Sequence, residues 1–202
     1  MIAIIDYGMG NLGSVFKALE GVGCDVRIVD TVKDISDADG IVLPGVGAMS
    51  AAMNNLERHG LIETVIGQIK SGKPFLGICL GLQMLFEYSE EGGRVDGLGV
   101  LKGKVARFTD ELKVPHMGWN QLNFKKRPDV VEGIPEGSFF YFVHSFYVVP
   151  DDDDVVMTTT DYGIDFVSSI SVDNITAVQF HPEKSQKWGL KLLENFGRSV
   201  GK

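Results

Sequence analysis

FLGICLGL, at residues 75–82, passes from an apolar run into a segment with helical character. We expect a strand over Phe75–Ile78, opened by Lys73–Pro74, and a helix from about Leu80 to Tyr88. A strand that is apolar at every position is buried on both faces, as the strands of parallel sheets are. The segment therefore predicts an α/β fold built on a parallel sheet.

Apolar runs upstream of this segment repeat the pattern. We expect strands over Ile2–Asp6, Val26–Asp30 and Ile41–Leu43. Asn11 can cap a helix that runs to about Gly21, and Pro44–Gly47 predicts a loop before helices that continue to about Gly72. Strands and helices that alternate in this way predict a mostly parallel central sheet flanked by helices on both faces.

The second half of the chain has a different character. From Gly99 to Phe180 it is rich in β-forming residues, and turn signals separate the runs. The clearest runs are Phe139–Val149, Val155–Thr160, Phe166–Val172 and Ile175–Phe180. A helix is expected over Lys187–Arg198. We therefore expect an antiparallel β extension on the parallel core, all within a single domain over residues 1–202.

Composition limits the classes of partner and compartment. The 202 residues carry a net charge of −8, which argues against binding nucleic acid or an anionic membrane through bulk electrostatics. Two distant cysteines suit a reducing compartment, and no signal peptide or membrane-length apolar run is present in the sequence, so we expect a cytoplasmic protein. The run Asp151–Asp154 predicts a solvated turn, because four adjacent carboxylates cannot all face one metal ion.

Gly77, Cys79 and Gly81 have the spacing of a nucleophile elbow, G-x-S-x-G, with cysteine in place of serine. The glycines allow a tight strand-to-helix turn, which places the nucleophile at the carboxyl end of a strand. The free amides and positive end of the following helix favour a thiolate, and the Leu80 amide can donate to an oxyanion. The alternative is a small buried hydrophobe, which suits Cys24 better.

A thiol nucleophile needs a histidine, and the chain has four. His59 suits a helix end, His116 an exposed loop, and His144 a structural position inside an apolar run. His181 ends a strand before Pro182, and Glu183 follows two residues later. In extended backbone these two side chains share one side, so the carboxylate can orient the imidazole. We therefore predict a Cys79–His181–Glu183 triad.

These residues resemble the triad of class I glutamine amidotransferases, a flavodoxin-like family. Within it the chain is most similar to the glutaminase subunits of imidazole-glycerol-phosphate synthases. The segments that carry this second resemblance are Ile4–Leu12, Pro44–Met49, Pro115–Asn120 and His144–Tyr147. Glutaminase subunits of the anthranilate or pyridoxal-phosphate synthase type remain the alternative within the family.

The resemblance implies a reaction and a set of site residues. Cys79 would attack the carboxamide carbon of glutamine, and water would then hydrolyse the glutamyl thioester. The amides of Val46 and Leu80 would hold the oxyanion, with Val46 flipping into place when a partner binds. Substrate contacts would come from Gly45, Gly47, Gln83, Glu91, Ser145 and Phe146. Neither a cofactor nor a metal is implied.

The resemblance also implies a partner. Ammonia is protonated in neutral water, so it would pass through a channel into a (β/α)₈-barrel cyclase subunit that makes imidazole glycerol phosphate and AICAR in histidine biosynthesis. The candidates for the interface of this heterodimer are Asn11, Met117, Trp119, Asn120 and Lys184.

One alternative comes from another class of protein. Gly8, Gly10 and Gly13 follow a strand and open a helix with the spacing G-x-G-x-x-G, and Asp30 ends the next strand. This pattern is typical of dinucleotide-binding proteins. It leaves Cys79 and His181 without a role, and the same is true of a catalytically inactive binding module on this fold.

Overall fold

The computed structural model describes residues 1–109 and 111–200. Its first half contains β1 (Ile2–Ile5), α1 (Leu12–Gly21), β2 (Val26–Val29), α2 (Val32–Asp37), β3 (Gly40–Gly45), α3 (Met49–Arg58), α4 (Ile62–Lys70), β4 (Phe75–Cys79), α5 (Leu80–Gln83), β5 (Phe86–Ser89) and β6 (Val95–Asp96). The second half contains β7 (Leu101–Arg107), β8 (His116–Gln121), β9 (Asn123–Phe124), β10 (Phe139–His144), β11 (Phe146–Pro150), β12 (Val156–Asp161), β13 (Asp165–Val172), β14 (Ile175–Val178) and α6 (Gln186–Ser199), with short 3₁₀ helices at Asp129–Val131, Asp153–Val155 and Pro182–Lys184.

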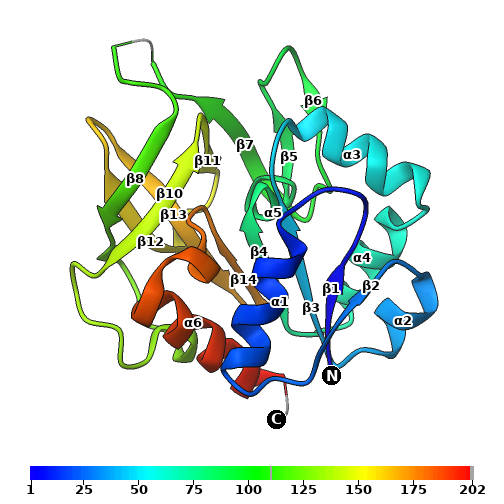
Figure 1. The fold of residues 1–202 in the computed structure, drawn as a ribbon. Helices are drawn as coiled ribbons and strands as arrows, with labels where there is room; N and C mark the ends of the chain where they lie inside the picture. Colours follow the sequence, from blue (N-terminus) through cyan, green and yellow to red (C-terminus); the bar gives the residue numbers. More distant parts are fainter. Residues whose placement is uncertain (110, 201–202) are drawn as a thin grey trace.

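The centre of the molecule is a parallel sheet in the order β2-β1-β3-β4-β14. Alternate residues of β1 enter different cores: Ile2 and Ile4 pack with α1 and α6, whereas Ala3 and Ile5 pack with α2, α3 and α4. Figure 1 shows α1 and α6 together on one side of this sheet. The predicted parallel sheet with helices on both faces is therefore confirmed.

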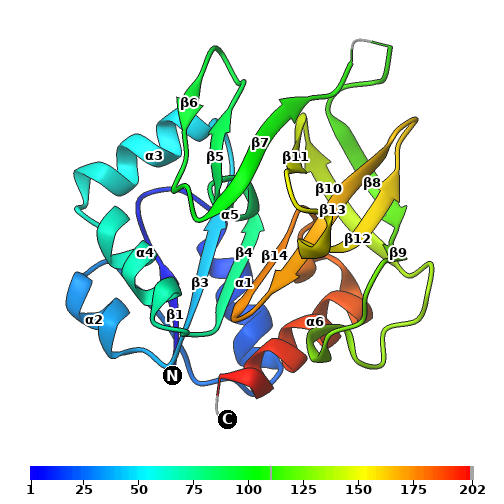
Figure 2. The ribbon, with the colours of Figure 1, turned by 180° about the vertical axis from the view of Figure 1, so that it is seen from behind.

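The β-rich half continues the same sheet in the antiparallel sense. β14 pairs antiparallel with β13, and the order then runs β13-β11-β7-β5-β6, with β12 joined to β13 and β9 joined to β12. A separate two-stranded sheet of β8 and β10 covers this part of the molecule (Figure 2). The predicted antiparallel extension is confirmed.

Several predicted boundaries were wrong. The helix after Cys79 ends at Gln83 and not at Tyr88, because residues 86–89 pair with β7 as strand β5. β3 continues through Pro44 and Gly45, which were expected in a loop, because both pair with β4. The run over residues 139–149 is two strands that separate at Ser145. Helix α2 was not predicted.

Two smaller expectations concern polar residues. Asn11 is the N-terminal cap of α1 by position. The expected hydrogen bond from the helix amides to its side chain is absent. Asp151–Asp154 is exposed, and the Asp152 side chain accepts a hydrogen bond from the Asp154 amide at 2.9 Å, which confirms a solvated turn. No helix within residues 1–109 and 111–200 is long and apolar enough to cross a membrane.

The glycines around Cys79 allow an unusually close packing of backbones. A Cβ atom on Gly81 would lie 1.9 Å from the Leu43 carbonyl oxygen of β3, and one on Gly77 would lie 2.7 Å from the Gly81 carbonyl oxygen. Neither position can accept a side chain unless the backbone moves. These glycines therefore fix how closely the elbow approaches β3.

We predict that Gly81→Ala destabilises the fold by about 3 kcal/mol, because the methyl group must displace the β3 backbone. Urea unfolding monitored by circular dichroism measures this. Gly67→Ala is the matched control, since Gly67 is exposed in α4 and a Cβ added there would have no atom within 4 Å, and it should stabilise the protein by about 0.5–1 kcal/mol. Equal stabilities for the two variants would contradict the packing argument.

Candidate active site

Cys79 is the last residue of β4 and has the strained backbone expected of an elbow. Its φ of 55° and ψ of −106° lie in a region that residues with a side chain rarely occupy. Gly45 of β3 is paired opposite Cys79, so the β3 end lies beside the thiol. Cys79 is 7% exposed and lines a cavity, so it does not lie on the open surface.

The helix that follows Cys79 is weaker than the sequence suggested. α5 has four residues, so it adds little of the dipole that was expected to favour the thiolate. The Leu80 amide still lies at the first position after the nucleophile, where it has no partner one turn earlier. The Leu80 amide, and not the dipole of a long helix, is therefore the group placed to act on the Cys79 thiol and on the predicted oxyanion.

His181 and Glu183 form a buried pair. His181 Nδ1 lies 2.9 Å from Glu183 Oε1, and the two side chains are 3% and 1% exposed. The backbone between them was expected to be extended, but it enters the 3₁₀ helix Pro182–Lys184, and the turn still brings the carboxylate to the ring. The predicted His–Glu contact is therefore present with a different backbone.

The surroundings of His181 act in opposite directions on its pKa. Burial lowers the pKa, but the negative charges that Cys79 and Glu183 carry when ionised outweigh burial and raise it to about 9. Among the described residues, His181 Nε2 has no hydrogen-bond partner of good geometry. The ring is thus oriented by Glu183 at one nitrogen, and its other nitrogen is left for proton transfer on the side of Cys79.

Hydrogen bonds from β10 hold the His181 segment in place. The His181 amide donates to the Tyr141 carbonyl at 2.9 Å, and the Tyr141 amide donates to Ser185 Oγ at 3.0 Å. Ser185 Oγ in turn donates to the His181 carbonyl at 2.6 Å. The base is thereby tied to the two-stranded sheet β8–β10 as well as to the central sheet.

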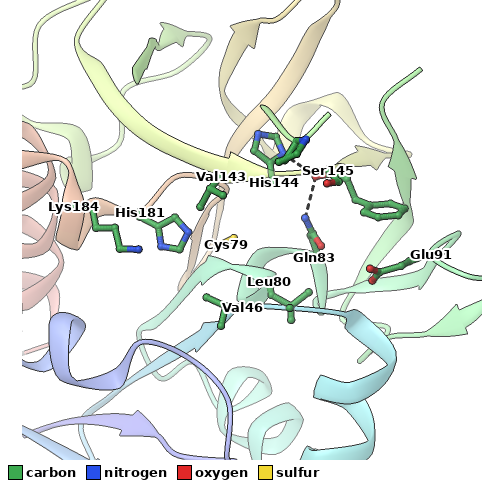
Figure 3. A pocket seen from close by; sticks show the side chains of 13 residues that line it. Val46, Cys79, Leu80, Gln83, Glu91, Val143, His144, Ser145, His181 and Lys184 are labelled. Carbon is green, nitrogen blue, oxygen red and sulfur yellow. Dashed lines mark hydrogen bonds between the residues drawn. The ribbon is translucent and has the colours of Figure 1, made fainter. Parts of the chain in front are cut away.

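A cavity of about 400 Å³ unites the predicted residues. Figure 3 shows His181 and Gln83 on opposite sides of Cys79. The residues that line the cavity are Val46, Gly47, Cys79, Leu80, Gln83, Glu91, Pro115, Val143, His144, Ser145, Phe146, His181 and Lys184. Glu183 and Gly45 are the predicted site residues that lie behind this lining, against His181 and Val46.

The predicted substrate-binding residues make contacts within the protein. Gln83 Nε2 donates to the Phe146 carbonyl at 3.0 Å, which joins the elbow to the loop between β10 and β11. Glu91 Oε2 accepts from the Met49 amide at 2.8 Å, at the start of α3. These contacts fix both side chains at the wall of the cavity, and their contact with a substrate remains a prediction.

The segment at the end of β3 carries the second predicted oxyanion donor. Val46 is 39% exposed, and Gly47 has a φ of 90°, a conformation that favours glycine. The backbone just before this segment, at Pro44 in β3, is held in place because the buried Tyr7 hydroxyl donates to the Pro44 carbonyl at 2.9 Å. Burial, and secondarily Cys79, raises the pKa of Tyr7, so the hydroxyl stays protonated and keeps this bond.

The remaining histidines include one error of interpretation. His59 lies at the C-terminal cap of α3 with its Nδ1 2.8 Å from the Asn55 carbonyl, as expected. His116 was expected in an exposed loop, but it begins β8, is 3% exposed, and its Nδ1 lies 2.9 Å from His144 Nε2. Pairing of β8 with β10 turns it inward. Sequence reasoning also missed Tyr7 and Gln179, which contact the site only through the folded chain.

The predicted interface residues divide between the two faces of the β8–β10 sheet. Met117 and Trp119 are 62% and 46% exposed and lie on its outer face, where Trp119 and Lys184 both approach the Tyr141 ring. Asn120 lies on the inner face and donates to the Asp161 carbonyl at 2.9 Å. Asn11 is exposed at the start of α1.

Comparisons with known proteins agree with this site. The family model of class-I glutamine amidotransferases matches residues 3–200. The chain belongs to this family. It is 59% identical over 200 residues to the imidazole glycerol phosphate synthase subunit HisH of Aquifex aeolicus (strain VF5), covering 98% of this chain and 97% of that protein. It is 53% identical over 199 residues to the subunit of the same name from Moorella thermoacetica, covering 98% and 95%.

Solved structures support the fold of this amidotransferase. A crystal structure of a glutamine amidotransferase aligns with a TM-score of 0.78 at 18% identity over the whole of both chains. The structure of PurLQS from Thermotoga maritima aligns with a TM-score of 0.76 at 19% identity over 98% of each. The match of the amidotransferase family model covers residues 3–200, including the Gly8–Gly13 segment that also has the spacing of a dinucleotide-binding motif. The chain therefore belongs to the amidotransferase family and not to a dinucleotide-binding family.

We predict that Glu183→Gln lowers the pKa of His181 from about 9, because the amide keeps the shape of the side chain but removes the charge that favours imidazolium. NMR titration of the histidine ring measures this. Glu194→Gln is the control, since Glu194 is a partly exposed carboxylate on α6, away from His181, and is paired with Lys191 and Arg198.

The same shift has a consequence for stability. A pKa raised above its unfolded value contributes stability that is present below about pH 6.5 and is lost as the pH rises through about 9. The unfolding free energy of Glu183→Gln should therefore fall less over this range than that of the unmodified protein. An equal fall in both, with an unchanged His181 titration, would contradict the assignment.

Proposed function

We propose that this amidotransferase is the glutaminase subunit of an imidazole glycerol phosphate synthase, which hydrolyses glutamine to glutamate and ammonia for histidine biosynthesis. The main support is a cavity that holds a strained cysteine beside a buried His–Glu pair, in a chain 59% identical to a synthase subunit of that name. The same cavity is large enough for an amino acid.

Cys79 is the nucleophile in this proposal. Its sulfur attacks the carboxamide carbon, and His181 Nε2 takes the thiol proton and delivers it to the departing ammonia. Glu183 stabilises the imidazolium that forms between these two steps. A water molecule, activated by the same imidazole, then attacks the glutamyl thioester and releases glutamate and the free thiol. No cofactor or metal takes part.

The oxyanion needs donors on the side of the cavity formed by the elbow and the β3 end. The Leu80 amide is one donor, and the Val46 amide is the second. Each such donor is typically worth about 10²–10³ in kcat. The two flanking glycines, Gly45 and Gly47, let the Val46 peptide turn while Tyr7 holds the residue before them. Partner binding is what completes this arrangement.

A second subunit receives the ammonia. The outer face of the β8–β10 sheet supports this, because Met117, Trp119 and Phe139 expose large apolar side chains there. Trp119 approaches the same Tyr141 ring as Lys184, which lines the cavity. Exposed aromatic anchors of this kind are typical of protein interfaces. The partner is a (β/α)₈-barrel cyclase, and the heterodimer works in the cytoplasm, a compartment that suits two free cysteines.

We predict that Cys79→Ala abolishes glutamate release by the subunit mixed with its cyclase, since Cys79 is the thiol that lines the cavity and forms the thioester. Release of glutamate is measured by a coupled dehydrogenase assay. Cys24→Ala is the matched control, because Cys24 lies outside the cavity against α6, and it should keep full activity. Glutamate release by Cys79→Ala at the control rate would refute the proposal.

We predict that Trp119→Ala weakens binding of the cyclase by about 2 kcal/mol, roughly a 30-fold rise in Kd, because it removes an aromatic anchor. Isothermal titration calorimetry measures this. Ile28→Ala is the control, since Ile28 is similarly exposed, at 42%, but lies on β2 at the far edge of the central sheet. A Kd that rises with Ile28→Ala and not with Trp119→Ala would move the interface to the other edge.

A further inference from the structure

A chain of polar contacts begins at the β8–β10 sheet and runs inward to the cavity. Asn120 Nδ2 lies 3.3 Å from His116 Nε2, and His116 Nδ1 lies 2.9 Å from His144 Nε2. His144 Nδ1 then lies 2.8 Å from the Phe146 carbonyl oxygen. The dashed lines in Figure 3 end at this loop, at the cavity wall.

A second arm connects the same carbonyl to the nucleophile. Gln83 Nε2 donates to the Phe146 carbonyl and to Gln179 Oε1, both at 3.0 Å. Gln179 Nε2 then donates to Cys79 Sγ at 3.7 Å. Gln179 is fully buried, so its amide group has no water to bond instead. Phe146 is the junction at which the two arms meet.

In the first arm, from Asn120 through His116 and His144 to the Phe146 carbonyl, the hydrogen-bonding groups fix the direction of every bond. We call it the histidine arm. A carbonyl only accepts, so His144 carries its proton on Nδ1 and its Nε2 must be an acceptor. His116 therefore carries its proton on Nδ1, and its Nε2 accepts from Asn120. Both rings are neutral, because burial lowers the pKa of His116 to about 4 and that of His144 to about 3. Protonation of either ring would put two donors face to face.

The glutamine arm is directional for the same reason. Both amide hydrogens of Gln83 are used, one on the Phe146 carbonyl and one on Gln179. Gln179 must accept with its oxygen, so its NH₂ group faces the sulfur. A reversed Gln179 would set two NH₂ groups against each other. The Cys79 sulfur thus has a fixed donor that the triad does not supply.

We propose that these residues position both reactants of the glutaminase: Gln179 holds the Cys79 thiolate, and the His116–His144 pair holds the substrate-binding backbone at Ser145–Phe146. The Phe146 carbonyl receives one donor from each arm, which fixes the orientation of its peptide. The substrate half of this inference rests on the proposed function, whereas the half that concerns the sulfur does not.

The sulfur half is tested by the pH dependence of Cys79 alkylation with iodoacetamide, in a Cys24→Ala background. His181 and Tyr7 are the titratable groups that face Cys79, and every variant keeps them. Gln179→Met removes the donor at similar volume, and Gln179→Glu removes it but keeps the acceptor for Gln83. The pH of half-maximal alkylation should rise by about one unit in Gln179→Met and further in Gln179→Glu.

Profiles identical to that of the parent protein would overturn this half of the proposal. Near-ultraviolet circular dichroism confirms that each variant is folded. If Gln179→Met does not fold, Gln179→Glu decides the question alone, because it leaves the Gln83 contact satisfied.

The histidine half is tested with a matched pair, His144→Leu and His144→Asn, which are nearly equal in shape. The asparagine amide can still donate to the Phe146 carbonyl, and leucine cannot. The probe is a diazoketone analogue of glutamine, which alkylates Cys79 only when the substrate site is formed. We expect His144→Leu to slow this reaction about tenfold and His144→Asn to stay within about threefold of the parent, while iodoacetamide rates are unchanged.

Equal rates for the leucine and asparagine variants would overturn the histidine half. If the parent protein does not react with the glutamine analogue but the iodoacetamide profiles shift as expected, the proposed substrate is wrong and the role of Gln179 stands. The two failures are therefore distinguishable.

Discussion

The site depends on one packing constraint, the contact of bare glycine backbone in the elbow with the β3 backbone. Because Gly81 has no side chain, the Leu43 carbonyl can occupy the space where a Cβ would lie. Gly77 allows the elbow to fold back on β4 in the same way, against Ala177 of β14. The chain at Cys79 has no room for a relaxed turn and takes a φ of 55°. A strain of this kind typically costs about 1–3 kcal/mol and persists only because the sheet on both sides holds it.

The same constraint brings the other predicted catalytic groups close to the sulfur. β3 and β14 are the two strands that flank β4, so the end of β3 presents Val46 on one side and the chain after β14 presents His181 on the other. In an open parallel sheet all three strands end at the same edge, where α/β proteins place their ligands. Burial alone would disfavour the protonated, charged form of the His181 ring. Glu183 and Cys79 more than offset this effect, so the ring can hold the proton that it takes from the thiol while it remains out of water.

Sequence patterns predicted the features that are local. The elbow, the parallel strands and the His181–Glu183 contact each depend on residues within a few positions of one another. The predictions that failed depended on distant pairing. Residues 84–88 continue a helical pattern after Cys79, but the pairing of residues 86–89 with β7 overrides it, and α5 ends at Gln83. His116 has proline and glycine neighbours typical of a loop, and only its register opposite His144 turns it inward. Gln179 contacts Cys79 across 100 residues of sequence, a distance that no local pattern can encode.

The β8–β10 sheet gives the molecule a direct connection between its exposed face and its nucleophile. Successive residues of a strand point to opposite sides, so Met117 and Trp119 face outward while His116 and Asn120 face inward. A partner that moves or stiffens β8 from outside therefore also moves or stiffens the histidines behind it, since a close-packed interior has no free volume to absorb the change. The effect ends at the Phe146 carbonyl, which Gln83 shares with Gln179 and thus with the sulfur. In the proposed assembly, a single two-stranded sheet would contact the second subunit on one face and hold the backbone at Ser145–Phe146 from the other.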